Sequence, residues 1–463
     1  MTDQHGDLPI AIIGAGPVGL AAAANLVERG LTPLILESGR QVGAAIRDWG
    51  HIRLFSPWRH NIDPASRRLL EPTGWTEPRL SSLPYGAELV EQYLEPLAAL
   101  PAIASALHLS TTVTAVSRSG MDKTHSRGRD ERPFLVRARA ADGTPTDYRV
   151  RGVIDASGTW AQRNPIGQAG LPAPGEAEAL ARGLITQPLP DVTGADRERF
   201  AGRHVLVIGA GHSAANTLIS LGQLVKNEPG TRISWAVRAP DASNLYGGGD
   251  LDGLPARGQL GTRLRTLVED GHITLHTSFT TTSFSSGQGL GVTGTTPHGV
   301  TTLEVDLLIP ATGFRPEVDI LREIRLDLDP AVEAPRALAP LIDPEFHSCG
   351  TVPAHGARLL AHPDKDFYIA GMKSYGRAPT FLLATGYEQV RSIAAALAGD
   401  LAAADQVHLE LPGTGVCSAD LGGTRDVPAA NAGQGGPAGS CCAAPQPALI
   451  GIATGLAHGR SAE

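Results

Sequence analysis

The feature that most constrains the fold is a run of three glycines directly after an apolar segment near the start of the chain. Residues 9–13 have the apolar pattern of a buried strand, and Gly14-Ala-Gly16-Pro-Val-Gly19 leads into an alanine-rich segment typical of a helix. Gly14 permits a tight turn, Gly16 lets a pyrophosphate approach the backbone, and Gly19 lets helix and strand pack closely. This order predicts the first half of a dinucleotide-binding unit.

An acidic residue at the expected distance supports this interpretation. Residues 34–36 form a second apolar strand pattern that ends in Glu37. An acid about 20 residues after the glycine turn can accept hydrogen bonds from a ribose hydroxyl. The alternative is a βαβ unit without nucleotide, in which the glycines serve packing alone.

A second unit repeats the pattern in the middle of the chain. Residues 204–208 predict a strand, Gly209-Ala-Gly211-His212-Ser213-Ala follows, and a helix is expected to about residue 225. We expect His212 and Ser213 to face a pyrophosphate, although a structural role for His212 is equally open. The next predicted strand, 233–238, ends in Arg238, which suits the 2′-phosphate of NADPH better than NADH. A solvated charge at the end of a strand is the alternative for Arg238.

Two further predicted strands end in similar runs of small residues. One strand ends in Asp155-Ala-Ser-Gly158-Thr-Trp, and its counterpart leads into Ala-Thr312-Gly313-Phe-Arg-Pro. Small residues at such ends let the backbone approach a dinucleotide. Between the glycine motif and the later strand end of each unit, segments including 134–140 and 272–284 predict β-meanders.

These motifs, in this order, resemble the flavin-containing monooxygenase and thioredoxin-reductase-like superfamily of two-dinucleotide-binding flavoproteins over residues 8 to about 400. The resemblance implies an α/β fold with two Rossmann-like three-layer domains, the NADPH domain being inserted into the FAD domain. We expect the first part of the FAD domain at 1–195, the NADPH domain at 196–316, the second part of the FAD domain at 317–400 and a tail at 401–463.

The resemblance also implies further site residues and the cofactors FAD and NADPH. Residues 43–49 are similar to the segment that crosses the flavin, Asn61 matches an active-site asparagine, and residues 367–380 resemble the closing FAD segment before a helix at 380–397. Met372 departs from the pattern, because an aspartate usually binds the ribityl chain there. The predicted cofactor-binding residues are Gly14, Gly16, Pro17, Gly19, Glu37, Trp49, Asp155, Gly158, Gly209, Gly211, His212, Ser213, Arg238, Thr312, Gly313, Gly371, Met372 and Thr380.

Two departures leave the electron acceptor open. The monooxygenase fingerprint Phe-x-Gly-x-x-x-His is missing from residues 184–202, and neither unit has a Cys-x-x-Cys for disulfide exchange. We expect an NADPH-dependent oxidoreductase that passes electrons to oxygen or a small substrate, as a monooxygenase does. A nucleotide-binding redox sensor is the alternative outside enzymes.

A cluster of thiols gives another alternative. The segment 401–463 is rich in Gly, Ala and Pro, which predicts a flexible tail, and it carries Cys417, Cys441 and Cys442. Three thiolates suit trivalent arsenic, and Cys441 with Cys442 could alternatively act as catalytic thiols that exchange electrons with the flavin. The chain also resembles flavoproteins associated with bacterial arsenic resistance (ArsO-type), whereas incidental cysteines are the plain alternative.

Composition limits the partners. The net charge of −8 gives no electrostatic footprint for nucleic acid, and no apolar run reaches the length of a membrane span. Four cysteines do not form a disulfide framework, so we expect a reducing cytoplasm. A small-molecule substrate or a metalloid is the expected partner, and a homodimer is open. The charged run 122–132 predicts a solvated loop.

Overall fold

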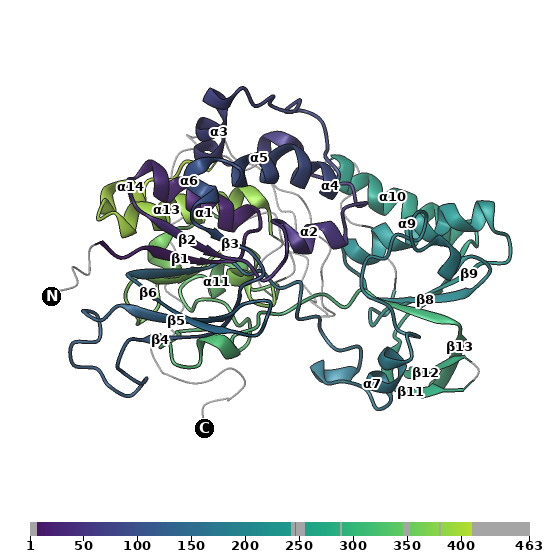
Figure 1. Ribbon diagram of the computed structural model, residues 1–463. Helices are drawn as coiled ribbons and strands as arrows, with labels where there is room; N and C mark the ends of the chain where they lie inside the picture. The colour runs from purple at the N-terminus through teal and green to yellow at the C-terminus, as the bar shows by residue number, and fades with distance from the viewer. Residues whose placement is uncertain are drawn as a thin grey trace, which may run out of the picture. The chain divides into compact units, whose positions relative to one another are not determined.

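A parallel sheet in the order β15-β7-β1-β2-β3 joins strands that are far apart in the sequence (Figure 1). The computed structural model describes residues 7–241, 246, 255–287, 289–345, 352–378 and 381–409. The strands of this sheet are β1 (Ile10–Ile13), β2 (Pro33–Leu36), β3 (Leu107–His108), β7 (Gly152–Asp155) and β15 (Phe367–Ile369).

Both faces of this sheet are covered, which explains why its strands are apolar throughout. Ile10 and Ile12 of β1 belong to the core shared with α1 (Pro17–Glu28) and α13 (Leu383–Leu397). Ala11 and Ile13, which point the other way, pack with the antiparallel sheet β4-β5-β6. The result is a three-layer unit. The covering strands are β4 (Thr112–Arg118), β5 (Phe134–Arg139) and β6 (Pro145–Val150).

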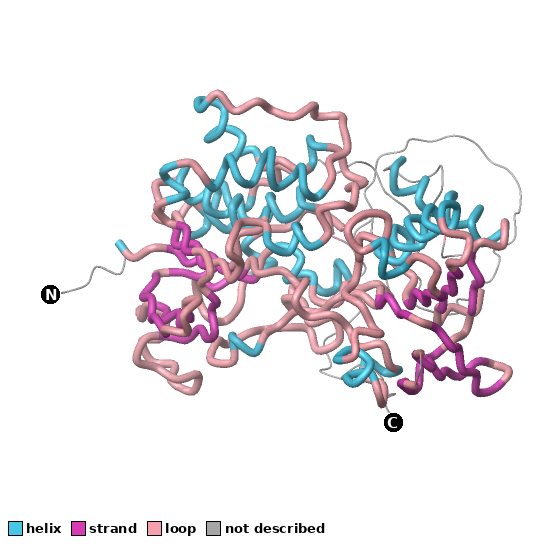
Figure 2. The backbone as a smooth tube through the Cα atoms, turned by 45° about the vertical axis from the view of Figure 1, so that its right-hand side comes forward, coloured by secondary structure: helices cyan, strands magenta, loops and turns pink. Residues whose placement is uncertain are grey.

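A second parallel sheet in the order β10-β9-β8-β14 repeats this plan. Val205 and Val207 of β8 share a core with α9 and α10, whereas Leu206 and Ile208 pack with the antiparallel sheet β11-β12-β13. Figure 2 shows the helices gathered on one side of the strands in each case. The elements are β8 (His204–Ile208), α9 (His212–Asn227), β9 (Arg232–Ala236), α10 (Pro255–Glu269), β10 (Ile273–His276), β11 (Thr280–Ser286), β12 (Leu290–Thr296), β13 (Gly299–Val305) and β14 (Leu307–Pro310).

The predicted fold class is confirmed, including the insertion. All strands of the second sheet lie between β7 and β15 in the sequence, although β7 and β15 are neighbours in the first sheet. The chain therefore leaves the first unit after β7, completes the second unit and returns to finish the first.

Shorter helices complete the described part of the chain, and none of its helices is long and apolar enough to cross a bilayer. They are α2 (Ala44–Asp48), α3 (Pro64–Leu70), α4 (Gly86–Leu89), α5 (Glu95–Ala98), α6 (Pro101–Ala104), α7 (Glu176–Ala181), α8 (Arg197–Phe200), α11 (Ala339–Ile342), α12 (Ala357–Leu360) and α14 (Leu401–Asp405), with 3₁₀ turns at Trp58–His60, Glu71–Thr73, Gln168–Gly170, Asp319–Leu321 and Gly371–Tyr375 and a π-helical turn at Val90–Leu94.

Two expectations at the ends of elements were wrong. Helix α13 begins at Leu383 and not at residue 380, because the backbone of Leu382 is extended and the ring of Phe381 lies 5.0 Å from that of Tyr375. Helix α14 lies within the residues assigned to the tail. It is held to α13 by Ser392 Oγ, which donates a hydrogen bond of 2.7 Å to the carbonyl oxygen of Ala404.

The charged segment 122–132 is only partly solvated, which corrects the sequence prediction. Arg129 is 3% exposed and binds Asp364 with two hydrogen bonds, of 2.6 and 3.0 Å. Arg118 lies 3.3 Å from the same carboxylate, and its guanidinium stands over the ring of Phe134 at 3.6 Å. This buried cluster ties the β4–β6 sheet to the segment that precedes β15.

Candidate functional site

The three glycines of the first turn differ in their surroundings: two lie against the backbone of the chain and one faces open space. Gly14 has a φ of +99°, and a Cβ there would come within 3.0 Å of the carbonyl oxygen of Ala156. A Cβ at Gly19 would lie 2.0 Å from the carbonyl oxygen of Gly14. A Cβ at Gly16 would meet no heavy atom within 4 Å. The fold itself therefore requires glycine at positions 14 and 19, whereas position 16 faces open space.

Helix α1 directs its N-terminus at that open space. Gly16 is its N-cap residue, no side chain caps the helix, and Pro17 starts its first turn with a favourable φ. The first N–H groups of a helix have no partner within it, and the helix dipole makes this end positive. The arrangement suits a phosphate group.

Glu37 links this turn to the end of β2. Its Oε2 accepts a hydrogen bond of 2.6 Å from the backbone N–H of Ala15, and its Oε1 accepts one of 2.7 Å from Gly39. The side chain is buried, and a carboxylate has further lone pairs that can accept from a hydroxyl group. The acid thus stands beside the glycine turn, as the sequence indicated.

The end of β7 carries a buried ion pair that sequence analysis missed. Asp155 Oδ2 accepts a hydrogen bond of 2.6 Å from Lys373 Nζ, and its Oδ1 accepts one of 2.6 Å from Ser157 Oγ. Gly158 has a φ of +71° with open space at its Cβ position. No spacing in the sequence connects residues 155 and 373, which become neighbours because β15 pairs with β7.

The turn after β15 is fixed by a buried hydrogen-bond network. The backbone N–H of Gly371 donates to Gln389 Oε1 at 2.8 Å, and Gln389 Nε2 lies 2.9 Å from Ser374 Oγ and from His355 Nε2. Burial lowers the pKa of His355 below its usual value. Met372 is half-buried in this turn, and Thr380 lies outside the described residues.

Trp49 and Asn61 differ in how open they are to a ligand. Trp49 is half-buried at the end of α2 and packs against Gly86. Asn61 is fully buried: its Nδ2 donates to the carbonyl oxygens of Ser56 and Pro57, and its Oδ1 accepts from Ser56 Oγ at 2.8 Å. These local bonds use both N–H donors of the amide and one of the two acceptor sites of its oxygen. Asn61 therefore fixes the local turn at residues 56–61, and its catalytic role stays a prediction.

The second glycine turn repeats the geometry of the first. Gly209 has a φ of +134°, and a Cβ there would lie 2.0 Å from the carbonyl oxygen of Ala311. A Cβ at Gly211 would meet nothing within 4 Å, and α9 begins there without a side-chain cap. His212 and Ser213 are half-buried in the first turn of α9, where the ring of His212 lies 5.3 Å from that of Phe55.

Of the other predicted residues of the second unit, two are exposed to solvent and one is bonded to another segment of the chain. Arg238 is exposed two residues after the end of β9. Thr312 Oγ1 donates a hydrogen bond of 2.8 Å to the carbonyl oxygen of Asn164, so this side chain joins two crossing chain segments. Gly313 follows it with a φ of +81° and is exposed.

The thiol site predicted from the sequence has no described counterpart. Cys417, Cys441 and Cys442 lie outside the described residues. Within the part of the chain that the structure describes, no three His, Cys, Asp or Glu side chains gather to hold a metal ion.

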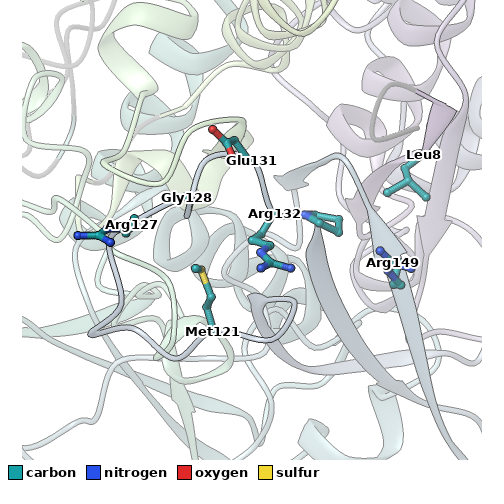
Figure 3. Close-up of a pocket in the computed structure, with 8 residues that line it drawn as sticks. Leu8, Met121, Arg127, Gly128, Glu131, Arg132 and Arg149 are labelled. Carbon is teal, nitrogen blue, oxygen red and sulfur yellow. The ribbon is translucent and has the colours of Figure 1, made fainter. Parts of the chain in front are cut away.

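A surface pocket of about 290 Å³ is lined by residues that belong to neither glycine turn. It is lined by Arg127, Arg132 and Arg149 together with Glu131 and Met121. Figure 3 shows Arg127 and Arg149 at opposite ends of it. Its charged side chains are exposed and none comes from a glycine turn, so we do not regard it as the cofactor site.

Comparisons with known proteins agree with the fold described above. The family model described as pyridine nucleotide-disulphide oxidoreductase matches residues 11–121. A search of curated proteins finds no match. Among solved structures, a bacillithiol disulfide reductase from Bacillus cereus matches with a TM-score of 0.63 at 19% identity, covering 85% of this chain and 99% of the other.

Two further structures represent the two branches of the predicted superfamily. The thioredoxin reductase of T. acidophilum has a TM-score of 0.53 at 16% identity, and a flavin-containing monooxygenase from Stenotrophomonas maltophilia has 0.53 at 19%. Each match covers 85% of this chain and 98% of the other. The chain has the fold of the two-dinucleotide-binding flavoproteins. The fold predicted from the sequence is thereby confirmed.

Proposed function

We propose that this two-dinucleotide-binding flavoprotein is an NADPH-dependent oxidoreductase that holds FAD at the Gly14–Gly19 turn and NADPH at the Gly209–Ala214 turn. The carrying observation is the open space at both Gly16 and Gly211, each at the uncapped N-terminus of a long helix that follows a parallel strand. Such an end binds the pyrophosphate of a dinucleotide.

When bound, FAD supplies two-electron chemistry by taking a hydride from the nicotinamide and passing the electrons on. The chain's own part in the first unit is to hold the cofactor. The N–H groups at the start of α1 bind phosphate oxygens, and Glu37 accepts hydrogen bonds from ribose hydroxyls. Gly158, at the end of the adjacent strand β7, leaves room for the cofactor beside the backbone.

In the second unit, the N-terminus of α9 binds the other pyrophosphate, and Arg238 selects the nucleotide. Its exposed guanidinium, just beyond β9, can pair with a 2′-phosphate, and only NADPH carries that group. This position supports NADPH as the preferred hydride donor.

For the electron acceptor we propose oxygen or a small substrate, as in a monooxygenase. The cysteines of the chain stand at 349, 417, 441 and 442, so neither dinucleotide unit has the Cys-x-x-Cys that disulfide exchange within it requires. An NADPH-dependent thiol or metalloid oxidoreductase that acts on trivalent arsenic through the C-terminal cysteines is the alternative, and it rests on the clustering of those cysteines in the sequence.

The test is anaerobic reduction of the purified protein by NADPH and NADH, followed by admission of oxygen. We expect yellow protein with one FAD per chain, bleaching by NADPH faster than by NADH, and reoxidation by oxygen. Protein without flavin, or flavin that neither nucleotide reduces, would contradict the proposed function. Reduced flavin that persists in oxygen and is reoxidised only by arsenic compounds would favour the metalloid alternative.

A further inference from the structure

A buried lysine stands at the edge of the first sheet where its strands end. Lys373 is 1% exposed, and its Nζ donates hydrogen bonds to Asp155 Oδ2 at 2.6 Å and to Ser157 Oγ at 3.1 Å. Asp155 is the last residue of β7, and Ser157 lies two residues beyond it. The lysine comes from the 3₁₀ turn that follows β15, so the pairing of β15 with β7 brings the charges together.

The ammonium group lies one strand away from the first glycine turn. Asp155 is the register partner of Ile13, the last residue of β1. A Cβ at Gly14 would come within 3.1 Å of Ser157 Cα, so the segment that holds the lysine touches the turn directly. In open parallel sheets, ligands bind outside these carboxyl ends of the strands.

Burial of this pair needs a reason beyond stability. Taking two charges out of water costs free energy that their attraction often only offsets, and apolar residues of similar volume commonly serve as well. An ammonium group has three N–H donors, and the described residues accept from two of them. The third donor has no acceptor among the described residues.

We propose that Lys373 is a cofactor-binding residue whose third N–H donates to a ribityl hydroxyl or phosphate oxygen of FAD. Asp155 and Ser157 position it by holding its other two donors. Asp155 is thus a positioning residue, which replaces the direct cofactor contact expected from the sequence. The inference rests on the proposed binding of FAD at the Gly14–Gly19 turn.

The decisive variant removes both charges together, because Lys373→Met alone would leave the Asp155 carboxylate buried without a partner. We expect the Asp155→Leu/Lys373→Met protein to unfold cooperatively, like the wild-type apoprotein. It should bind FAD about tenfold more weakly or worse, which is the loss expected for one hydrogen bond to a charged group. Quenching of flavin fluorescence on titration of the apoprotein measures the dissociation constant.

A folded double variant with wild-type affinity for FAD would overturn the proposal and make the pair purely structural. Should this variant fail to fold, Asp155→Asn/Lys373→Gln gives the test, because it also removes both charges, keeps polar side chains at both positions, and offers one N–H donor fewer than lysine at position 373. The same tenfold loss is expected, and unchanged affinity would again overturn the proposal. Arg336→Met is the matched control: Arg336 pairs with Asp327 at the surface, outside the residues assigned to cofactor binding, and its loss should leave the affinity unchanged.

Riboflavin, which lacks phosphate, separates the two oxygen types. An equal loss of affinity for riboflavin and FAD in the variants assigns the contact to the ribityl chain, whereas a loss confined to FAD assigns it to a phosphate. The wild-type titration keeps the two hypotheses apart. Wild-type protein that does not bind FAD contradicts the proposed function, whereas binding by wild type and variants alike contradicts only the role of Lys373.

Discussion

Gly16→Val separates the needs of the fold from those of the cofactor. The backbone of Gly16 has φ −80° and ψ −175°, which valine adopts without strain, and a Cβ there would meet no heavy atom within 4 Å beyond its chain neighbours. It would instead fill the space expected for the pyrophosphate. Loss of two hydrogen bonds to a charged phosphate costs about 3–6 kcal/mol, or about two to four decades in the dissociation constant of FAD.

The assay compares flavin content after purification with the thermal unfolding of the apoproteins. We expect Gly16→Val to unfold like wild-type apoprotein and to carry little FAD. Gly19→Val should fail to fold, because a Cβ there would lie 2.0 Å from the carbonyl oxygen of Gly14. Gly211→Val is the matched control, with full FAD and impaired reduction by NADPH. A yellow Gly16→Val protein with one FAD per chain would refute the placement of the cofactor.

Two further predictions follow from the second unit and the C-terminal segment. Arg238→Ala should raise the KM for NADPH by about one to two decades, the effect of losing about 1.5–3 kcal/mol, and should leave the KM for NADH nearly unchanged; equal changes for both nucleotides would contradict its role. Deletion of residues 413–463 should leave FAD content and NADPH oxidation by artificial acceptors intact and should abolish arsenite binding. Cys441→Ser with Cys442→Ser should have the same effect, and undiminished arsenite binding by the truncated protein would show that the thiols are incidental.

The glycine turns could be predicted from the sequence because their geometry is local. A strand, a turn with φ values open to glycine, and a helix lie within about 20 residues, and each glycine has a distinct steric reason. Gly14, Gly19 and Gly209 meet backbone atoms in the structure, as those reasons require. The insertion of one unit into the other was implied by the resemblance to the two-dinucleotide-binding flavoproteins.

The buried charge clusters could not be predicted, because they join residues that only the completed sheet brings together. Lys373 pairs with Asp155 and Arg129 pairs with Asp364, in each case across more than 200 positions of the sequence. The sequence around Arg129 is rich in charge and indicated a solvated loop. A single arginine that turns inward to a distant carboxylate leaves no local signal.

Asn61 shows the opposite case, in which a local motif suggests more than the contacts in the structure support. The motif resemblance suggested a catalytic amide, yet Ser56 and Pro57 bind both of its N–H donors and one acceptor site of its oxygen. Local sequence indicates that such an asparagine is special but does not show whether a ligand or the chain itself is its partner.

The buried carboxyl group of Asp63 makes the stability of the protein depend on pH in a way that can be tested. Asp63 is 1% exposed at the start of α3, where it accepts hydrogen bonds from Ser66 N at 2.8 Å and from Asn25 Nδ2 at 3.3 Å. Burial raises the pKa of Asp63 from 3.8 to about 6 despite these bonds. Between these two values the folded protein holds a proton that the unfolded chain has lost, so the free energy of unfolding falls as pH rises from about 4 to 6.

The size of this effect is about 3 kcal/mol, because each pH unit between the two pKa values corresponds to about 1.4 kcal/mol. Asp63→Asn removes the titration, and its amide oxygen still accepts from Ser66 N. Burial lowers the pKa of His362 to about 4, which acts in the opposite direction by reducing stability as pH falls below 6.5, but this contribution is common to both proteins. The difference between wild type and variant, measured by urea unfolding from pH 4 to 7, therefore isolates Asp63. We expect the variant to gain about 3 kcal/mol relative to wild type across that range, and parallel profiles would show that Asp63 stays ionised in its buried site.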